Sequence, residues 1–377
     1  MSSIAAAKII SQRTYPVGGK LNVTEHFFDV PKDHSKPEGG TIRVFARSVK
    51  KRDSAIVPDS SKDKEQLPWM CYLQGGPGMP CRAPQNYNFT QTTLDRGYQL
   101  LYLDQRGTGL STPLTASTLG MRGNNEVQAR YTKLYRADSI VIDCEAIRQA
   151  LTADYPEEKK KWSIIGQSFG GFCSITYLSF HPEGLRESFI FGGLQPLVKS
   201  PDEVYRRLYK KVIQHRRSAA TCFDEHLIYS ILHEPLYCEG NASNWSAHRL
   251  MSEYRVFDLD KTDEDEPIYF TGEMIYPWMF EDYSELRKVQ DTANRIASDS
   301  DWPALWDEKQ LEKNDVPVYA ASYVEDMYVD FDLSMETARK VKGCKVFTTN
   351  VMFHDGMRSK MEEVFKQAFA LRDDVVD

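Results

Sequence analysis

Residues 162–172 place a serine where nucleophilic chemistry could occur. Their sequence, Trp-Ser-Ile-Ile-Gly-Gln-Ser-Phe-Gly-Gly-Phe, runs from an apolar strand pattern through Gly-x-Ser-x-Gly into a helix pattern. Gly166 and Gly170 allow a sharp, strained turn that lifts the hydroxyl of Ser168 out of the sheet, and the amide of Phe169 is then free to donate to an oxyanion. Composition alone gives roughly 0.1 such motifs in a chain of this length. A tight turn without chemistry is therefore the alternative for the motif taken alone.

A serine hydroxyl at neutral pH needs a general base within hydrogen-bonding distance, and that base needs an acid to orient it. Asp326 comes just after an apolar strand pattern, and His354 comes just after the last one. Of the eight histidines only His354 follows Asp326, which gives the chain order Ser, Asp, His. Taken singly, a capping or solvated carboxylate and a structural histidine are the alternatives, and Glu325 is the rival acid. Together, the three positions predict a catalytic triad.

Two loops follow the first two predicted parallel strands. Gly75-Gly76-Pro77-Gly78 comes after the strand pattern of residues 68–74. Its glycines let backbone amides approach a substrate oxygen closely, which suits a second oxyanion donor, and an ordinary turn is the alternative. Asp104 and Arg106, after the next strand, are predicted to pair and to brace the loops at the strand ends. A phosphate-binding loop is excluded, because no Lys-Ser/Thr follows at its spacing.

The elements that must position these residues alternate between strand and helix patterns. Two antiparallel strands are predicted first, at residues 21–30 and 41–49. Further strands are predicted at 68–74, 98–103, 162–165, 187–194, 316–324 and 345–350, and helices at 137–155, 172–180, 335–341 and 358–371. This alternation is typical of an α/β fold with a doubly wound, mostly parallel sheet.

Residues 196–301 interrupt the alternation. They begin with a helix pattern at 201–215 and then become dense in aromatic and acidic residues, without long β-branched runs. We therefore expect a helical cap at 196–301 over the catalytic face, inserted between a first part of the core at 1–195 and a second part at 302–377.

Composition narrows the class of partner. The chain has 377 residues, 41% of them hydrophobic, and its net charge of −7 gives no reason to expect a nucleic-acid or membrane partner. The N-terminal segment lacks the pattern of a signal peptide, and no apolar run reaches the length of a membrane span. The seven cysteines are scattered without Cys-x-x-Cys pairs. We therefore expect reduced thiols in a cytoplasmic protein, without a disulfide framework or a metal site.

Together, the motifs resemble the proline iminopeptidase (prolyl aminopeptidase) family of α/β-hydrolases, and its longer fungal and bacterial members most. The resemblance is carried by Gly-Gly-Pro-Gly (75–78), Asp-Gln-Arg-Gly-Thr-Gly (104–109), Gly-Gln-Ser-Phe-Gly-Gly (166–171), Gly-Gly-Leu (192–194), Glu-Asp-Met-Tyr-Val (325–329) and His-Asp-Gly (354–356). It implies the α/β-hydrolase fold with a helical cap and no cofactor. It also implies Ser168 as nucleophile, Asp326 as acid and His354 as base, with oxyanion donors at the backbone amides of Gly76 and Phe169.

The resemblance also implies a substrate. Members of this family remove an N-terminal proline from peptides, and carboxylates in the cap hold the imino group. The candidates here are Glu234 and Glu273, and Gly75 of the glycine-rich loop is expected in the same substrate site. A cationic amine in a closed aromatic pocket needs an opposite charge beside it, which supports these candidates. Helix-start or solvated carboxylates are the alternatives.

Two departures from the family keep other functions open. Gln74 precedes the glycine-rich loop where many relatives carry histidine. The cap is also predicted to be short, because residues 216–224 pass directly between segments that longer relatives separate by a helical block. The first alternative is a general esterase or small-molecule hydrolase with the same triad and another pocket. The second is an inactive relative, or a binding protein, with an incomplete cap. The sequence has no pattern that indicates an oligomeric state.

Overall fold

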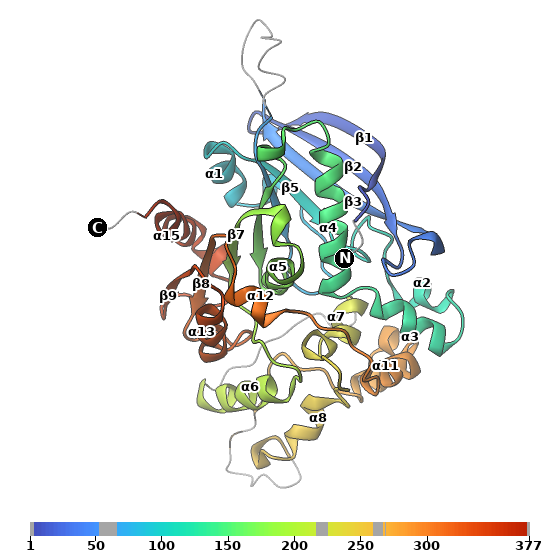
Figure 1. The fold of residues 1–377 in the computed structure, drawn as a ribbon. Coiled ribbons are helices and arrows are strands. Elements are labelled where there is room, and N and C mark those ends of the chain that lie inside the picture. The colour runs from blue at the N-terminus through green and yellow to red at the C-terminus, as the bar shows by residue number, and fades with distance from the viewer. Residues whose placement is uncertain (1–3, 53–65, 216–224, 259–266, 268, 375–377) are drawn as a thin grey trace, which may run out of the picture.

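One nine-stranded sheet organises the chain. The computed structural model describes residues 4–52, 66–215, 225–258, 267 and 269–374, and the strands lie in the order β1-β2-β3-β5-β4-β6-β7-β8-β9 (Figure 1). Their bounds are Lys8–Val17 (β1), Leu21–Pro31 (β2), Thr41–Lys51 (β3), Trp69–Leu73 (β4), Gln99–Asp104 (β5), Trp162–Gln167 (β6), Leu185–Phe191 (β7), Val318–Tyr323 (β8) and Cys344–Thr349 (β9). The strands from β5 to β9 in this order pair in parallel. The predicted α/β fold with a mostly parallel sheet is confirmed.

The antiparallel part has three strands and not the two that the sequence predicts. β1 pairs with β2, β2 with β3, and β3 joins the parallel part through β5. Strand β1 has the sequence Lys-Ile-Ile-Ser-Gln-Arg-Thr-Tyr-Pro-Val, and most of its residues are exposed. At the sheet edge, backbone pairing with one neighbour defines such a strand, so side-chain alternation does not reveal it.

Side chains alternate along the strands and bury both faces of the sheet. On β4 and β5, Cys71 and Leu101 pack into one hydrophobic cluster, and Met70 and Leu100 into another. Helices α4 (Ala137–Leu151), α5 (Phe169–Phe180), α12 (Glu308–Glu312) and α13 (Phe331–Lys340) contribute to the first cluster, and α1 (Phe89–Asp95) and α15 (Met361–Asp373) to the second. Burial on both faces explains why the parallel strands have near-continuous apolar sequences.

The helices between β7 and β8 lie mostly in a layer of their own. They are α6 (Asp202–His215), α7 (Leu227–Leu232), α8 (Ser246–Met251), α9 (Met279–Asp282), α10 (Ser284–Arg287) and α11 (Gln290–Ala297), followed by α12. In Figure 1, α6, α7, α8 and α11 lie together below the sheet. Their apolar side chains form a third hydrophobic cluster, to which residues between 114 and 135 also contribute.

Helix α3 (Asn125–Lys133) packs against α11, so the first part of the chain also reaches this layer. The remaining helices are α2 (Ala116–Gly120) and α14 (Gly356–Ser359). The short crossing predicted at residues 216–224 lies outside the described residues, and the three-part division of the chain stays a prediction. In the described part of the chain, no helix combines the length and the apolar character that a membrane crossing requires.

Candidate active site

The turn between β6 and α5 holds Ser168 in a strained conformation. Its backbone has φ 53° and ψ −121°, in a region that non-glycine residues rarely adopt. A Cβ on Gly166 would lie 2.4 Å from the carbonyl oxygen of Gly170, and a Cβ on Gly170 would lie 1.9 Å from the carbonyl oxygen of Leu73. The two glycines of the motif are therefore required by the close approach of the backbone. The turn presents Ser168 directly before the first residue of α5.

Three side chains from the ends of different strands form a hydrogen-bonded series. The Oγ atom of Ser168 lies 2.9 Å from Nε2 of His354, and Nδ1 of His354 lies 2.9 Å from Oδ2 of Asp326. A carboxylate can only accept, so Nδ1 carries the proton and Nε2 is left to accept from the serine hydroxyl. This is the tautomer that a general base requires. The structure brings together the serine, acid and histidine that the sequence predicts, and it places Asp326, in preference to Glu325, on the imidazole.

The carboxyl group of Asp326 is held firmly. Its side chain is 2% exposed, and its Oδ1 atom accepts from the backbone amides of Tyr328 (2.7 Å) and Val329 (3.0 Å). The Nζ atom of Lys211, on α6, donates to the backbone carbonyl of Asp326 at 2.8 Å. The loop after β8 is thus fixed both from within and from the helical layer.

The environment of His354 favours its protonated form. Burial alone lowers the pKa of this imidazole, but the adjacent Asp326 carboxylate and the charge of Glu273 raise it above 6.5, while Arg358 opposes them. The ring of Tyr328 stacks on the imidazole with 4.4 Å between centroids. A base with a raised pKa accepts the serine proton more readily, so the site is suited to general-base catalysis near neutral pH.

Backbone amides for an oxyanion lie beside the serine. Phe169 is the first residue of α5, so its amide has no acceptor within the helix and lies at the positive end of the helix dipole. A Cβ on Gly75 would lie 3.0 Å from Cβ of Ser168, which shows how closely the glycine-rich loop passes the nucleophile. Gly76 has φ +132°, a conformation that favours glycine. The geometry is compatible with the predicted donors, whose roles stay predictions.

A cavity of about 320 Å³ opens on this series. It is lined by Gln74, Gly75, Gly76, Met79, Gln167, Ser168, Tyr229, Glu273, Tyr328, His354, Asp355 and Arg358. Five residues predicted for the site are among them. Phe169 and Asp326 lie behind this lining, at the start of α5 and behind the imidazole.

Glu273 is the acidic group that the helical layer contributes to this cavity. Its side chain is 14% exposed, and burial raises its pKa to about 8, with Asp326 adding to the rise and His354 opposing it. The Nε2 atom of His233 lies 3.9 Å from its Oε1 atom, but burial lowers the pKa of His233 to about 4, so this ring is neutral. Glu273 therefore has no cationic partner in His233. A cation that entered the cavity would supply this missing countercharge and would favour the ionised form of Glu273.

Glu234, the other predicted cap carboxylate, does not line the cavity. Its two oxygens accept from the backbone amides of Ser246 (3.0 Å) and Ala247 (2.9 Å) at the start of α8. Burial raises its pKa to about 7. The structure therefore distinguishes the two candidates. Glu234 accepts hydrogen bonds from the amides at the start of α8, in line with the alternative of a helix-start carboxylate, whereas Glu273 lines the cavity.

The predicted ion pair between Asp104 and Arg106 is wrong. The guanidinium of Arg106 is buried and makes two 2.6 Å hydrogen bonds to Asp143 on α4. The carboxylate of Asp104 instead accepts from the backbone amides of Cys81 (2.8 Å) and Leu110 (3.1 Å). Neighbours along a loop point in different directions, and sequence proximity does not reveal the α4 partner. Both residues still brace loops beside the strands.

Sequence reasoning did not single out several residues of the cavity wall. Tyr328 and Arg358 are two and four positions after Asp326 and His354, inside or next to the recognised motifs, so their positions offered a signal. Tyr229 and Met79 offered none, because nothing in their local sequence links them to the serine. Within the described residues, no group of three or more His, Cys, Asp or Glu side chains could hold a metal ion.

Comparison with known proteins identifies an α/β-hydrolase domain and full-length relatives. A model of the alpha/beta hydrolase fold matches residues 68–224. Proline iminopeptidase aneH of Aspergillus aculeatus is 36% identical over 452 positions, which cover 100% of this chain and 99% of that protein. A proline iminopeptidase of Aeromonas sobria is 35% identical over 431 positions, which cover 94% of this chain and 97% of that protein.

The alignment lengths show that the relatives carry additional residues. The alignment to the Aspergillus protein spans 452 positions against 377 residues in this chain, so at least 75 positions of that protein have no counterpart here. These lengths do not locate the additional residues along the chain. The shortened cap therefore stays a prediction.

Proposed function

We propose that this chain, which belongs to the proline iminopeptidase family of α/β-hydrolases, is a serine aminopeptidase that releases N-terminal proline from peptides. One observation carries the proposal. The hydrogen-bonded series of Ser168, His354 and Asp326 opens on a cavity that also holds the carboxylate of Glu273. A nucleophile and a site for a cationic amine thus share one enclosed space.

The first half of the reaction forms an acyl-enzyme. The Oγ atom of Ser168 attacks the prolyl carbonyl carbon as Nε2 of His354 takes the hydroxyl proton. The negative charge that develops on the carbonyl oxygen is held by the amides of Phe169 and Gly76. His354 then gives its proton to the leaving nitrogen, the C–N bond breaks, and the shortened peptide departs.

The second half returns the enzyme to its starting state. Water takes the place of the leaving amine, and His354 removes one of its protons as the water oxygen attacks the prolyl ester of Ser168. The proton then passes to Oγ, and free proline leaves. Asp326 keeps its negative charge throughout, so it stabilises the imidazolium in both halves.

The substrate's imino cation is the group that Glu273 would bind. A secondary ammonium taken out of water needs a compensating charge, and a carboxylate that burial disfavours gains most from receiving one. The rings of Tyr229 and Tyr328 also line this cavity and offer apolar surface to a pyrrolidine ring. The proposed substrate is therefore a peptide with a free N-terminal proline.

We propose residues 196–301 as the cap of the site. Tyr229 and Glu273 come from this segment, whereas Ser168 and His354 come from the sheet loops. The cavity is thus enclosed jointly by the two parts. A cytoplasmic location is also proposed, with the support of the six described cysteines, which are all free thiols.

The proposal is tested with a panel of aminoacyl-2-naphthylamides on the purified protein and on Ser168→Ala. The wild-type protein is expected to prefer the prolyl substrate, and the variant is expected to lose at least about 10³-fold in kcat while keeping its fold. A fluorophosphonate probe should label Ser168 and no residue in the variant. Hydrolysis of p-nitrophenyl acyl esters without prolyl-naphthylamide would instead indicate a general esterase. No labelling and no hydrolysis would indicate an inactive relative.

A further inference from the structure

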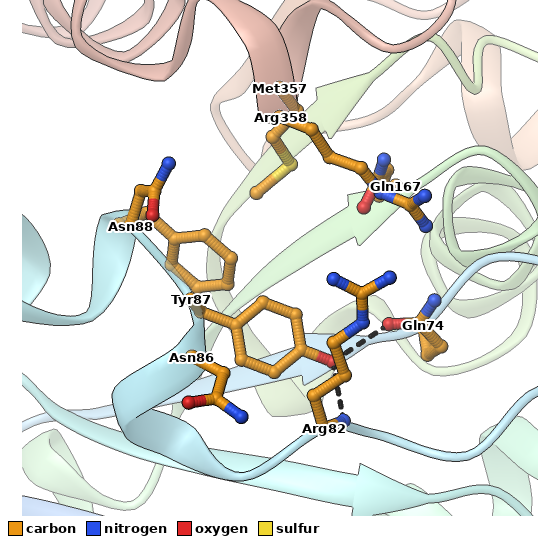
Figure 2. A pocket seen from close by; sticks show the side chains of 9 residues that line it. Gln74, Arg82, Asn86, Tyr87, Asn88, Gln167, Met357 and Arg358 are labelled. Carbon is orange, nitrogen blue, oxygen red and sulfur yellow. Dashed lines mark hydrogen bonds between the residues drawn. The ribbon is translucent and has the colours of Figure 1, made fainter.

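A second cavity, of about 210 Å³, adjoins the triad cavity (Figure 2). It is lined by Gln74, Arg82, Asn86, Tyr87, Asn88, Phe89, Gln167, Met357 and Arg358. Three of these, Gln74, Gln167 and Arg358, also line the triad cavity, so the two cavities are neighbours. A cavity of this volume can receive a group of the size of a single amino-acid residue.

Two of the residues shared by the cavities are next to reacting groups in the sequence. Gln74 directly precedes the glycine-rich loop, and Gln167 directly precedes the nucleophile Ser168. A substrate whose prolyl carbonyl lies at Ser168 has its proline on the side of Glu273. The second cavity contains neither Glu273 nor Tyr229. It is therefore the space available to the residue that follows the scissile bond.

The wall of the second cavity is fixed by hydrogen bonds and stacking. The hydroxyl of Tyr87 donates to Oε1 of Gln74 at 3.0 Å and accepts from the backbone amide of Arg82 at 2.9 Å, as the dashed lines in Figure 2 show. Its ring stacks on Tyr102 with 4.9 Å between centroids. The hydroxyl of Tyr72 lies 3.0 Å from Oε1 of Gln74 and 2.7 Å from Oε1 of Gln167, and it can donate its one proton to either. A wall built in this way needs little rearrangement to receive a ligand.

The charges of this cavity are of one sign. Arg82 and Arg358 line it, and no aspartate or glutamate does. Among the described residues, neither guanidinium has a hydrogen-bond acceptor or an acidic partner within ion-pair distance. Figure 2 shows both groups turned toward the space beside Gln74 and Gln167. Two unpaired cations in a protein of net charge −7 mark this cavity as a site for an anion.

The two cavities together carry charges that are complementary to those of a zwitterion. Glu273 lines the triad cavity, Arg82 lines the second cavity, and Arg358 lines both. A dipeptide carries a cation at its N-terminus and a carboxylate about two residue lengths away, or roughly 7 Å at about 3.5 Å per residue. Each further residue moves that carboxylate up to about 3.5 Å farther from the serine.

We propose that Arg82 and Arg358 bind the C-terminal carboxylate of short prolyl peptides, so that the enzyme prefers prolyl dipeptides with a free carboxylate. This inference rests on the proposed aminopeptidase activity and adds the substrate's length and terminal charge to it. Guanidinium groups suit the role, because their planar donors match both oxygens of a carboxylate. Both arginines are exposed residues, so water and salt weaken the interaction.

The test compares kcat/KM for prolyl-alanine with kcat/KM for its C-terminal amide, which differs only in the terminal charge. The wild-type enzyme is expected to favour the free acid by about tenfold. The ratio of acid to amide should fall in Arg82→Gln and in Arg358→Gln and approach one in the double variant. The change should arise in KM, and lysine at either position should restore part of it. Salt at about 1 M should reduce the wild-type ratio.

Arg130→Gln provides the matched control, because Arg130 is an exposed arginine on α3 whose partner is Glu126 and which lines neither cavity. This variant should keep the wild-type ratio. Equal kcat/KM for acid and amide in the wild-type enzyme, with both hydrolysed, would overturn the carboxylate site and leave the aminopeptidase proposal intact. A ratio that is unchanged in the double variant would do the same. Failure to hydrolyse prolyl-naphthylamide would overturn both proposals.

Discussion

At the level of single residues, Asp326 has two effects on His354 that can be separated. It orients the imidazole through Nδ1, and its charge raises the pKa that burial alone would lower. In Asp326→Asn, the imidazole of His354 loses the carboxylate that orients it. Its pKa is then set by burial, which lowers it, and by the weaker effects of Glu273 and Arg358. We expect kcat to fall by about 10³- to 10⁴-fold. We also expect the acid limb of kcat/KM to move to lower pH, since the neutral imidazole is the active form.

The measurement is a pH profile of p-nitrophenyl acetate hydrolysis, because this ester has no amine to bind Glu273. In the wild-type enzyme the acid limb should lie above pH 6.5, the ordinary pKa of histidine. Glu325→Gln is the control, since Glu325 is the neighbouring acid that the sequence left as a rival. It should keep both the rate and the position of the limb. A limb that does not move in Asp326→Asn would contradict the assigned electrostatics.

Glu273 should make the free enzyme less stable as the pH rises. Burial raises its pKa from the ordinary 4.5 to about 8, so the folded state keeps a proton that the unfolded chain releases between these values. The stability that this proton contributes is fully present below about pH 4.5 and is lost as the pH rises toward 8. Glutamine does not titrate. Glu273→Gln should therefore match the wild-type Tm near pH 4 and exceed it above pH 8.

Thermal unfolding of both proteins across this pH range, without substrate, checks the sign. The same variant should raise KM for prolyl-naphthylamide by about 10- to 100-fold, because it removes the charged partner of the imino group. Binding and stability thus oppose each other at this residue, as is common for functional groups that are buried without a partner. A Tm difference that is constant with pH would show that Glu273 is ionised at no cost.

At the level of elements, helix α6 connects the helical layer to the triad. Lys211 donates to the backbone carbonyl of Asp326 at 2.8 Å and lies 3.2 Å from Oδ2 of Asp330, which caps α13. In Lys211→Met, the loop after β8 loses both contacts. We expect kcat for prolyl-naphthylamide to fall by about tenfold, with a smaller change in KM, because the imidazole is less well oriented.

Lys210→Met is the matched control for this prediction. Lys210 is the exposed neighbour on the same helix, so the substitution has the same effect on helix propensity without touching the loop. It should leave kcat unchanged. If both variants lower kcat equally, α6 acts through its general stability and not through the contact to Asp326. Near-UV circular dichroism would show whether either variant alters the fold.

The elements also show which parts of the fold the sequence reveals. Buried parallel strands have continuous apolar sequences and were predicted within a few residues, as for residues 98–103 and β5. The edge strand β1 was not predicted, because its side chains are mostly exposed and its identity depends on pairing with β2. Local sequence patterns indicate which side chains are buried, but they do not indicate which strands pair with each other.

The same limit explains the outcome at the site. Ser168, Asp326 and His354 follow strands that end at one edge of the sheet, so their convergence follows from topology. Glu234 and Glu273 lie in a segment of short helices without such a rule. The structure was needed to show that Glu234 accepts from the start of α8 and that Glu273 faces the cavity. The partners of Asp104 and Arg106 were missed for the same reason.

At the level of the whole molecule, Arg136 joins the sheet to the helical layer. It precedes α4, its side chain is 1% exposed, and its guanidinium donates to the carbonyl oxygens of Pro235 (3.2 Å), Cys238 (2.9 Å) and Pro303 (2.8 Å). It also lies 4.8 Å from the ring centre of Trp302. One side chain therefore holds segments that are far apart in the sequence and that flank the helices α8 to α11.

Because the cavity is enclosed by both layers, their attachment should control both stability and activity. Arg136→Met keeps much of the apolar stem but leaves three carbonyls without this donor. Those of Pro235 and Cys238 are in buried residues, where each such loss costs about 1–3 kcal/mol. We expect Tm to fall by at least about 5 °C. Prolyl-naphthylamide hydrolysis should fall more than ester hydrolysis, because Glu273 belongs to the layer that loosens and the triad does not. Arg130→Met, at an exposed position on α3, should change neither. A variant that unfolds in two steps would show that the layers separate before the sheet melts, and an unchanged Tm would show that Arg136 does not hold them together.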